Sequence, residues 1–356
     1  MADDRAARFS GVREVPDRLS IDAERLAGFL ATVIPGFAGP LRVRQFKGGQ
    51  SNPTYLVEAA DRTLVLRRKP PGTLLASAHA VDREARVMSA LSAAGFPTPH
   101  VFAYCEDPEV IGTPFFVMEH VAGRIIWDPA IPGATPAERG ALYRDMGDTL
   151  ADLHRIAPST IGLTTFGRSE GYVHRQITRW SRQYGVSATI EIPEMDRLMA
   201  FLPSVDWPDH PPAVVHGDYR IDNLIFAADT AKVRAVLDWE LATLGDPVAD
   251  FAYHAMSFVM PRRNAATGTL EGLDLAALGI PPLEEYVARY EARTGLAVAG
   301  MLDLYLAYNL FRFAAIIQGI VGRVRDGTAT SETPYTIDSV IPLAEAGWER
   351  ARRAGA

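Results

Sequence analysis

The most informative stretch of this sequence holds acidic and amide side chains at spacings suited to phosphoryl transfer. His216, Asp218 and Asn223 lie in one short segment, and Asp238 follows a second apolar run. Phosphoryl transfer needs a carboxylate near the acceptor hydroxyl and oxygen ligands for the Mg²⁺ that bridges the nucleotide phosphates. Asp218 supplies the carboxylate, and Asn223 and Asp238 supply the hard oxygen donors that Mg²⁺ prefers. The spacing therefore predicts a phosphotransferase site.

Other interpretations of the same residues stay open. Asp218 would also serve as a turn cap, and Asn223 as an ordinary amide at the entry to a strand. A metallohydrolase site would use His216 with Asp218, although no second histidine stands at a ligand spacing. Asp246 precedes Pro247, which predicts a helix N-cap.

The order of these motifs resembles that of the aminoglycoside phosphotransferase/choline kinase family, which shares the protein-kinase-like fold. The matching residues are His216-Gly217-Asp218, Asn223, Asp238, Gly245-Asp246-Pro247 and Asp250. The resemblance covers residues 40–325 and implies phosphorylation of a small-molecule hydroxyl with ATP and Mg²⁺ as cofactors. It implies that Asp218 is the catalytic base or orients the acceptor, that Asn223 and Asp238 hold Mg²⁺, and that His216 braces the loop.

The elements around these motifs predict an α+β, protein-kinase-like fold with two lobes. Period-two alternation predicts antiparallel strands at 41–47, 54–58, 63–69, 101–104 and 114–119. Helical patterns predict a helix at 21–30 capped by Ser20 and others at 78–93 and 135–155. A hairpin is expected from 224–226 and 233–237. The expected division is a lead-in at 1–20, a nucleotide-covering N-terminal lobe with one sheet-packed helix at 21–119, and a larger, mainly helical C-terminal lobe at 120–356.

The strand at 63–69 supplies the positive charge that ATP phosphates need. Alternation places Val65, Arg67 and Lys69 on one face. In kinases, the equivalent strand places a small apolar residue against adenine and a lysine two residues later. Val65 and Arg67 match these two places, with arginine where lysine is usual. Arginine binds phosphate through a bidentate fork. Lys69 is the competing candidate, and a solvated basic strand end is the third interpretation.

Glu84 is the predicted partner of Arg67. It falls on the apolar stripe of the helix at 78–93, and an acid within such a stripe needs a partner. The alternative is an edge position at which Glu84 reaches solvent or pairs with Arg83 or Arg86.

Two further segments are expected to contact the nucleotide. Residues 48–52 join the first two strands, where Ser51, Asn52 and nearby backbone N–H groups would contact phosphate. A plain hairpin turn has the same composition. The backbone of residues 116–121 would form the hinge that binds adenine, so Glu119 and Val121 are assigned to the cofactor site.

The acceptor is harder to predict. Residues 261–356 contain 11 acidic and 10 basic residues, a balance that does not support a polycationic aminoglycoside. Segments 46–55, 66–72, 176–184 and 311–319 resemble the phosphotransferase domains found fused or adjacent to acyl-CoA dehydrogenases. That similarity implies a hydroxyacyl-CoA or hydroxy-acid acceptor. The acceptor-side candidates are Arg179, Arg182, Tyr184, Arg312 and Arg323, because arginine suits CoA phosphates. Each would also serve as an ordinary surface or helix-pairing residue.

The composition of the chain narrows the classes of protein to which it could belong. The chain has 36 basic and 43 acidic residues, a net charge of −7, and a mildly acidic chain is a poor general nucleic-acid binder. Its one cysteine, Cys105, forms no internal disulfide, which favours a reducing compartment. We expect a cytoplasmic monomer or homodimer with no membrane span. An aminoglycoside-type kinase and a non-catalytic nucleotide-binding module are the rival functions.

Overall fold

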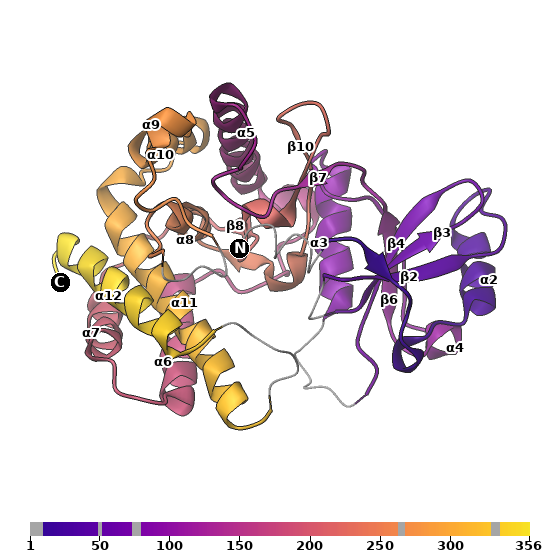
Figure 1. Ribbon diagram of the computed structural model, residues 1–356, viewed down its shortest axis with the longest axis horizontal. Helices are drawn as coiled ribbons and strands as arrows, with labels where there is room; N and C mark the ends of the chain where they lie inside the picture. The colour runs from indigo at the N-terminus through magenta and orange to yellow at the C-terminus, as the bar shows by residue number, and fades with distance from the viewer. Residues whose placement is uncertain (1–9, 49–51, 73–79, 263–267, 329–334) are drawn as a thin grey trace. The chain divides into compact units, whose positions relative to one another are not determined.

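The structure is a computed structural model of the chain and describes residues 10–48, 52–72, 80–262, 268–328 and 335–356. Its contacts divide the chain into two compact units (Figure 1). Unit 1 comprises Met1–Ile125, Ile161–Phe166 and Asn223–Ala242. Unit 2 comprises Ile126–Thr160, Gly167–Asp222 and Thr243–Ala356.

Unit 1 is built on a six-stranded antiparallel sheet with the strand order β1-β2-β3-β4-β6-β5. Its strands are β1 (Val12–Arg13), β2 (Arg42–Phe46), β3 (Thr54–Glu58), β4 (Thr63–Arg68), β5 (Val101–Cys105) and β6 (Phe115–Glu119). Its helices are α2 (Ala23–Val33), α3 (Val81–Ala93) and α4 (Pro108–Ile111). A second sheet, of order β10-β9-β7, contains β7 (Arg124–Ile125), β9 (Leu224–Phe226) and β10 (Val233–Val236).

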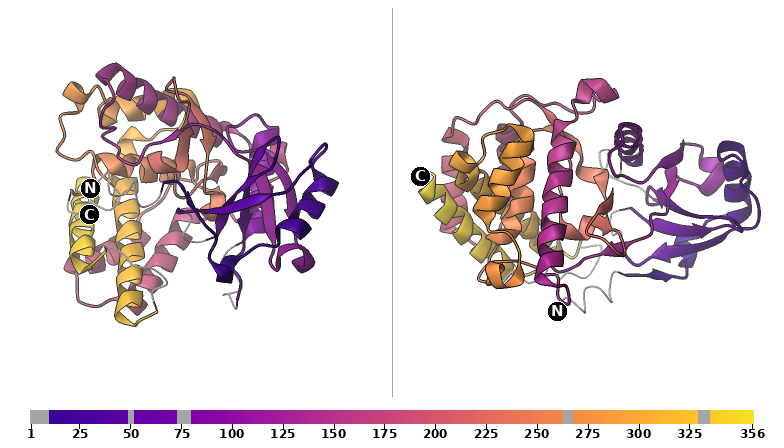
Figure 2. Two further views of the ribbon diagram at one scale, coloured as in Figure 1. Left: turned by 45° about the vertical axis from the view of Figure 1, so that its right-hand side comes forward. Right: turned by 90° about the horizontal axis from the view of Figure 1, so that it is seen from above.

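Alternation along β4 separates the two faces of the large sheet. Leu64 and Leu66 belong to a buried core that also contains residues of α2 and α4. Val65 and Arg67 point to the opposite face, where α3 packs and supplies Glu84 to Arg67. Figures 1 and 2 show α2 and α4 on one side of this sheet and α3 on the other. The predicted strand pattern therefore places Arg67 on the face that α3 covers.

Local details of unit 1 differ from the sequence prediction. The first predicted helix begins at Ala23 rather than at residue 21, and Asp22 rather than Ser20 caps it. The Asp22 carboxylate accepts hydrogen bonds from two backbone N–H groups of the first turn, which is the stronger capping arrangement. Strands β1 and β7 are two residues long, too short to show a period in the sequence.

The hairpin formed by β9 and β10 is grouped with unit 1, whereas its sequence position suggested the C-terminal lobe. β9 pairs with β7, and the N–H of Val236 donates to the carbonyl of Pro97. The Trp239 ring packs edge-on against Phe96, with centroids 5.9 Å apart. These contacts tie the hairpin to the N-terminal part of the chain.

Unit 2 is mainly helical. Its helices are α5 (Pro136–Arg155), α6 (Tyr172–Ser187), α7 (Pro193–Phe201), α8 (Pro247–Ala255), α9 (Leu275–Leu278), α10 (Leu283–Thr294), α11 (Leu302–Arg325) and α12 (Ile337–Arg353). A short antiparallel pair joins β8 (Ala213–Val215) to β11 (Thr243–Gly245). The long helix α11 packs against α6, α8 and α12. It is long and apolar enough to cross a membrane, but 83% of its most apolar window is buried within the protein, as in a core helix.

Strand pairing and capping in unit 2 position the loop that carries His216 and Asp218. β8 leads into this loop, and β11, its partner, leads into α8. Asp246 caps α8 by accepting from the N–H groups of Val248 and Ala249, as predicted from Asp246-Pro247. The loop and the first turns of α8 therefore start from neighbouring strands.

Candidate active site

A carboxylate from α8 holds the start of the loop. Asp250 accepts hydrogen bonds from the backbone N–H groups of His216 at 2.7 Å and Gly217 at 2.8 Å. Nε2 of His154 lies 3.2 Å from the same carboxylate. Burial raises the pKa of Asp250, but the hydrogen bonds from His154 and from the His216 backbone outweigh this effect and lower it overall. Asp250 is thus a buried carboxylate that organises the loop backbone.

His216 braces the loop, as predicted. Its side chain is fully buried, and its Nδ1 accepts a hydrogen bond from the backbone N–H of Asp218 at 3.2 Å. Between them, Gly217 has a φ of +81°, a left-handed conformation that glycine adopts without strain. Asp218 therefore projects from a segment whose backbone groups are already bonded.

The Asp218 side chain is about a quarter exposed and accepts a hydrogen bond from Tyr253. The Tyr253 hydroxyl on α8 lies 2.5 Å from Oδ1 of Asp218. Burial and the adjacent Asp218 raise the pKa of Tyr253 well above its usual range, so the tyrosine stays protonated as a donor. This contact fixes one carboxylate oxygen within unit 2, while part of the side chain remains exposed to solvent.

Arg312 lies beneath this pair. It is 7% exposed, and its Nη2 donates to the carbonyl of Gly217 at 2.7 Å. Its guanidinium also lies over the Tyr253 ring, 4.9 Å from the centroid. Arg312 was expected to contact the acceptor, but the structure places it inside the protein, where it supports Gly217 and Tyr253.

In unit 1, Arg67 stands among three carboxylates. Its Nε lies 3.0 Å from Oε2 of Glu84, which confirms the predicted ion pair. Its Nη2 donates to Asp238 at 2.8 Å and to Glu240 at 3.1 Å. Lys69 follows the end of β4 and is partly exposed. Of the two candidates for gripping phosphate, Arg67 is the one that pairs with Glu84.

Burial and the neighbouring charges shift the pKa values of both Glu84 and Arg67. Glu84 is 2% exposed, and burial together with the nearby Asp238 and Glu240 raises its pKa to about 7, although Arg67 acts to lower it. Burial opposes the charge on Arg67, but the three carboxylates raise its pKa overall, so it stays charged. The Arg67 guanidinium thus contacts three carboxylates, and a bound cation would be attracted to the same negative charge.

The two residues predicted to hold Mg²⁺ are both in unit 1 and fit that ion. The N–H of Leu237 donates to the carbonyl of Asn223 at 2.8 Å, which brings the backbones that carry Asn223 and Asp238 side by side. Asp238 has a φ of +65°, a conformation that costs a non-glycine residue on the order of 1 kcal/mol. An amide oxygen and a carboxylate are hard donors, and Mg²⁺ binds proteins through few such ligands.

The other predicted nucleotide contacts fall in several environments. Val65 is buried opposite Met118, and Glu119 is exposed with its N–H donating to the carbonyl of His100. Val121 is partly exposed and Asn52 is fully buried. Ser51 lies outside the described residues.

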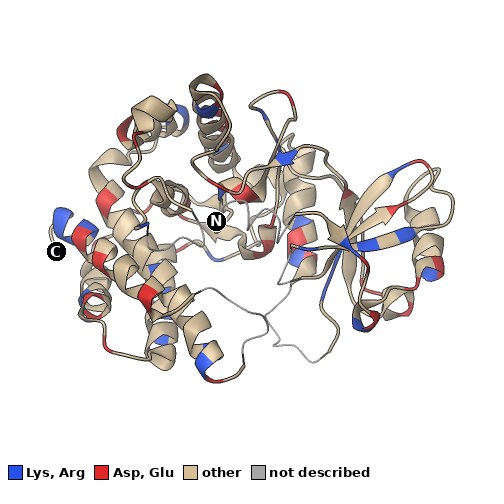
Figure 3. Ribbon diagram, in the orientation of Figure 1, with Lys and Arg blue, Asp and Glu red and all other residues tan. Residues whose placement is uncertain are grey.

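The remaining acceptor-side candidates differ in their exposure. Arg179 and Arg182 are exposed on α6, a helix with three arginines and no acidic residue (Figure 3). Arg179 stacks on Trp180, with its guanidinium 5.1 Å from the ring. Arg323 is exposed on α11, whereas Tyr184 is buried and does not reach the surface.

These features define a class of protein. A sheet unit with an Arg–Glu pair, together with a helical unit bearing a braced His-Gly-Asp loop, is the two-lobe α+β arrangement of kinase-like folds, as predicted. A family model described as the phosphotransferase enzyme family matches residues 42–300. The chain belongs to that family.

Curated relatives match nearly the whole chain. It is 41% identical to mouse acyl-CoA dehydrogenase family member 10 over 345 residues, 96% of this chain and 32% of that protein. It is also 41% identical to chicken acyl-CoA dehydrogenase family member 11 over 351 residues, 96% of this chain and 45% of that protein. The chain therefore spans less than half the length of these relatives.

Solved structures show the same fold. A Ralstonia eutropha protein assigned to the aminoglycoside phosphotransferases is 44% identical, with a TM-score of 0.85 over 95% of this chain and all of that chain. Choline kinase from Cryptosporidium parvum has a TM-score of 0.62 at 11% identity, covering 93% of this chain and 96% of that chain. The second likeness is one of fold alone.

Sequence reasoning missed the groups that position Asp218. Tyr253 lies 35 positions after it, and nothing in the local pattern of α8 marks this tyrosine as its partner. Glu240 was also missed, although it follows Asp238 by two residues.

Proposed function

We propose that this protein is a small-molecule kinase that transfers the γ-phosphoryl group of ATP to a hydroxyl group. The observation that carries the proposal is the partly exposed Asp218 carboxylate, held by Tyr253 on a loop whose backbone is bonded to Asp250. Such a carboxylate can accept a hydrogen bond from an incoming hydroxyl and orient it for in-line attack. As the acceptor oxygen bonds to the γ-phosphorus, the bond from that phosphorus to the β–γ bridging oxygen breaks, ADP leaves, and the acceptor proton passes to Asp218.

The proposed roles in unit 1 follow from its charges. Arg67, oriented by Glu84, would bind the α- and β-phosphates through its fork. Asn223 and Asp238 would hold Mg²⁺, which when bound neutralises charge on the phosphates. Because Arg67 also contacts Asp238, nucleotide binding is expected to redistribute the contacts of this cluster.

We propose a hydroxyacyl-CoA or a related hydroxy acid as the acceptor. Two observations support this class: the relatives are named for acyl-CoA dehydrogenases, and α6 offers arginines to an anionic group. Arg175, Arg179 and Arg182 are spaced so that they lie along one side of that helix. Phosphates such as those of CoA are natural partners for such a row. A cytoplasmic location belongs to the same proposal.

The aminoglycoside alternative is favoured by the name of the Ralstonia eutropha structure. A panel experiment separates the candidates: the purified chain is incubated with ATP, Mg²⁺ and hydroxyacyl-CoAs, hydroxy acids, aminoglycosides, choline or homoserine. Products are identified by the mass added by one phosphoryl group. Phosphorylation of the acyl compounds supports the proposal, and phosphorylation of aminoglycosides alone replaces it. Tight binding of Mg·ATP without any phosphorylated product would indicate a non-catalytic module.

A further inference from the structure

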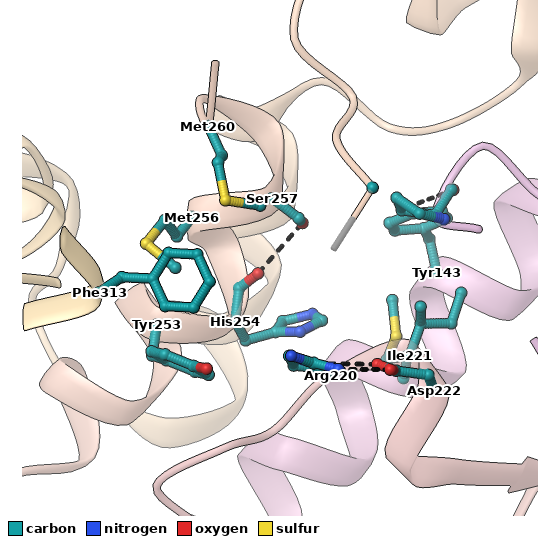
Figure 4. Close-up of a pocket in the computed structure, with 13 residues that line it drawn as sticks. Tyr143, Arg220, Ile221, Asp222, Tyr253, His254, Met256, Ser257, Met260 and Phe313 are labelled. Atoms are coloured by element: carbon teal, nitrogen blue, oxygen red, sulfur yellow. Dashed lines mark hydrogen bonds and ion pairs between the residues drawn. The ribbon is translucent and has the colours of Figure 1, made fainter. Parts of the chain in front are cut away.

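Unit 2 contains a small cavity beside the Asp218 loop (Figure 4). Its volume is about 40 Å³. Much of its wall is apolar and includes Met146, Met256, Met260 and Phe313. In Figure 4, Met256, Met260 and Phe313 gather on one side, and Ile221 and Tyr143 lie on the other. Methionine side chains adapt their shape to an apolar guest.

Two residues connect this cavity to Asp218. Tyr253 lines it and donates its hydroxyl hydrogen bond to Oδ1 of Asp218 at 2.5 Å. Arg220 also lines it, and its Nε lies 3.9 Å from the same oxygen. The apolar cavity therefore begins one side chain away from the carboxylate that is proposed to orient the acceptor hydroxyl.

The charges at the cavity cancel. Arg220 and Asp222 are its charged lining residues, and they form a direct ion pair in which the Asp222 side chain is only 6% exposed. Asp222 is thus not the surface residue that its polarity suggests. Burial lowers the pKa of His254 to about 4, so this lining side chain is neutral at neutral pH. A polycationic acceptor would need carboxylates to pair with here, and among the described lining residues the one carboxylate, Asp222, already pairs with Arg220.

We propose that this cavity binds a short aliphatic segment of the acceptor, next to the hydroxyl that is phosphorylated. The inference rests on the proposed function and specifies its substrate: an alcohol whose carbon chain continues for a short distance beyond the hydroxyl-bearing carbon. The cavity is a determinant of acceptor choice that is separate from any contact with a CoA group.

The size of the cavity sets the expected chain-length dependence. A volume of about 40 Å³ accommodates roughly one methylene group, since a methylene group is about as large as a water, which takes about 30 Å³ in the liquid. Burial of one methylene group increases kcat/KM about fourfold, equivalent to about 0.8 kcal/mol. The increase should level off after roughly one added methylene.

The test uses a series of hydroxy acids whose chain grows beyond the hydroxyl-bearing carbon by one methylene at a time. Ser257 is partly buried in the lining, and Ser257→Leu fills the cavity. Ser257→Ala removes the same hydroxyl without filling the space and is the matched control. We expect the chain-length increase in the wild type and in Ser257→Ala, and its loss in Ser257→Leu. The inference is overturned if the wild type shows no increase, or if Ser257→Leu lowers kcat/KM equally for every length.

A binding measurement distinguishes failure of this inference from failure of the proposed function. Acids of the same lengths without the hydroxyl cannot be phosphorylated, yet their chains should still enter the cavity. They should raise the melting temperature of the wild type by an amount that grows with chain length up to the same limit, and should not do so for Ser257→Leu. If this pattern appears without phosphoryl transfer to any hydroxy acid, the cavity stands and the kinase proposal fails. If transfer occurs and the binding pattern is absent, the cavity assignment fails alone.

Discussion

Replacement of Glu84 by glutamine should remove a specific pH dependence from the stability of the protein. Glu84 is buried beside Arg67 and near two other carboxylates, and its pKa rises from 4.5 to about 7. The folded state therefore holds a proton on Glu84 over a pH range in which the unfolded chain has lost it. Stability from this group is fully present below about pH 4.5 and is lost as pH rises through about 7.

The magnitude follows from the size of the shift. A rise from 4.5 to about 7 corresponds to roughly 3–4 kcal/mol, at about 1.4 kcal/mol for each pH unit. The free energy of unfolding of the wild type, minus that of Glu84→Gln, should fall by about this amount between about pH 4.5 and pH 8. Glutamine keeps the shape of the side chain but does not titrate, so it isolates the effect.

The assay is urea unfolding of both proteins at several pH values across this range. Glu109→Gln is the matched control, because the Glu109 side chain is 86% exposed. Its replacement should change the free energy of unfolding by the same small amount at every pH. The reasoning about the buried cluster would be refuted if the free energy of unfolding of the wild type, minus that of Glu84→Gln, did not change with pH. An increase of this difference with pH would refute it as well.

Three further substitutions test the Asp218 loop of unit 2 and the Arg67 cluster of unit 1. Tyr253→Phe removes the hydrogen bond to Asp218 and should lower kcat about tenfold in steady-state assays, with KM for ATP unchanged. The reason is that a hydrogen bond to a charged group contributes about 1.5 kcal/mol. A kcat within about twofold of the wild type would count against this role of Tyr253. Arg67→Met leaves Glu84 without its cation and should cost roughly 3–5 kcal/mol in urea unfolding, and a loss below about 1 kcal/mol would contradict the buried pair. Asp250→Asn cannot accept from both backbone N–H groups of the loop and should cost about 2 kcal/mol by the same measurement, whereas an unchanged midpoint would show that the loop does not depend on it.

The strands and helices whose apolar residues recur at a regular spacing could be predicted from the sequence. The alternation in β4 and the apolar stripe of α3 were enough to pair Arg67 with Glu84, because each pattern determines which side chains share a face. Capping chemistry likewise identified Asp246 as the start of α8. These predictions succeeded because each depends on residues a few positions apart.

The contacts that orient Asp218 were not predictable, because they join residues far apart in the chain. Tyr253 and Arg312 reach the loop only after α8 and α11 have packed together. Arg312 was therefore misplaced at the acceptor surface, although its burial assigns it a supporting position. The left-handed conformation of Asp238 was equally invisible, since nothing in its side chain requires it.

The central claim is that Asp218 orients the acceptor for phosphoryl transfer. Its most direct test is the rate of product formation by Asp218→Asn and the wild type, measured with ATP, Mg²⁺ and the acceptor found by the panel. Asparagine keeps the size of the side chain but cannot take the proton, so kcat should fall at least about a hundredfold. Unchanged unfolding and Mg·ATP binding would show that the variant is intact. Turnover equal to that of the wild type would contradict the assignment of Asp218.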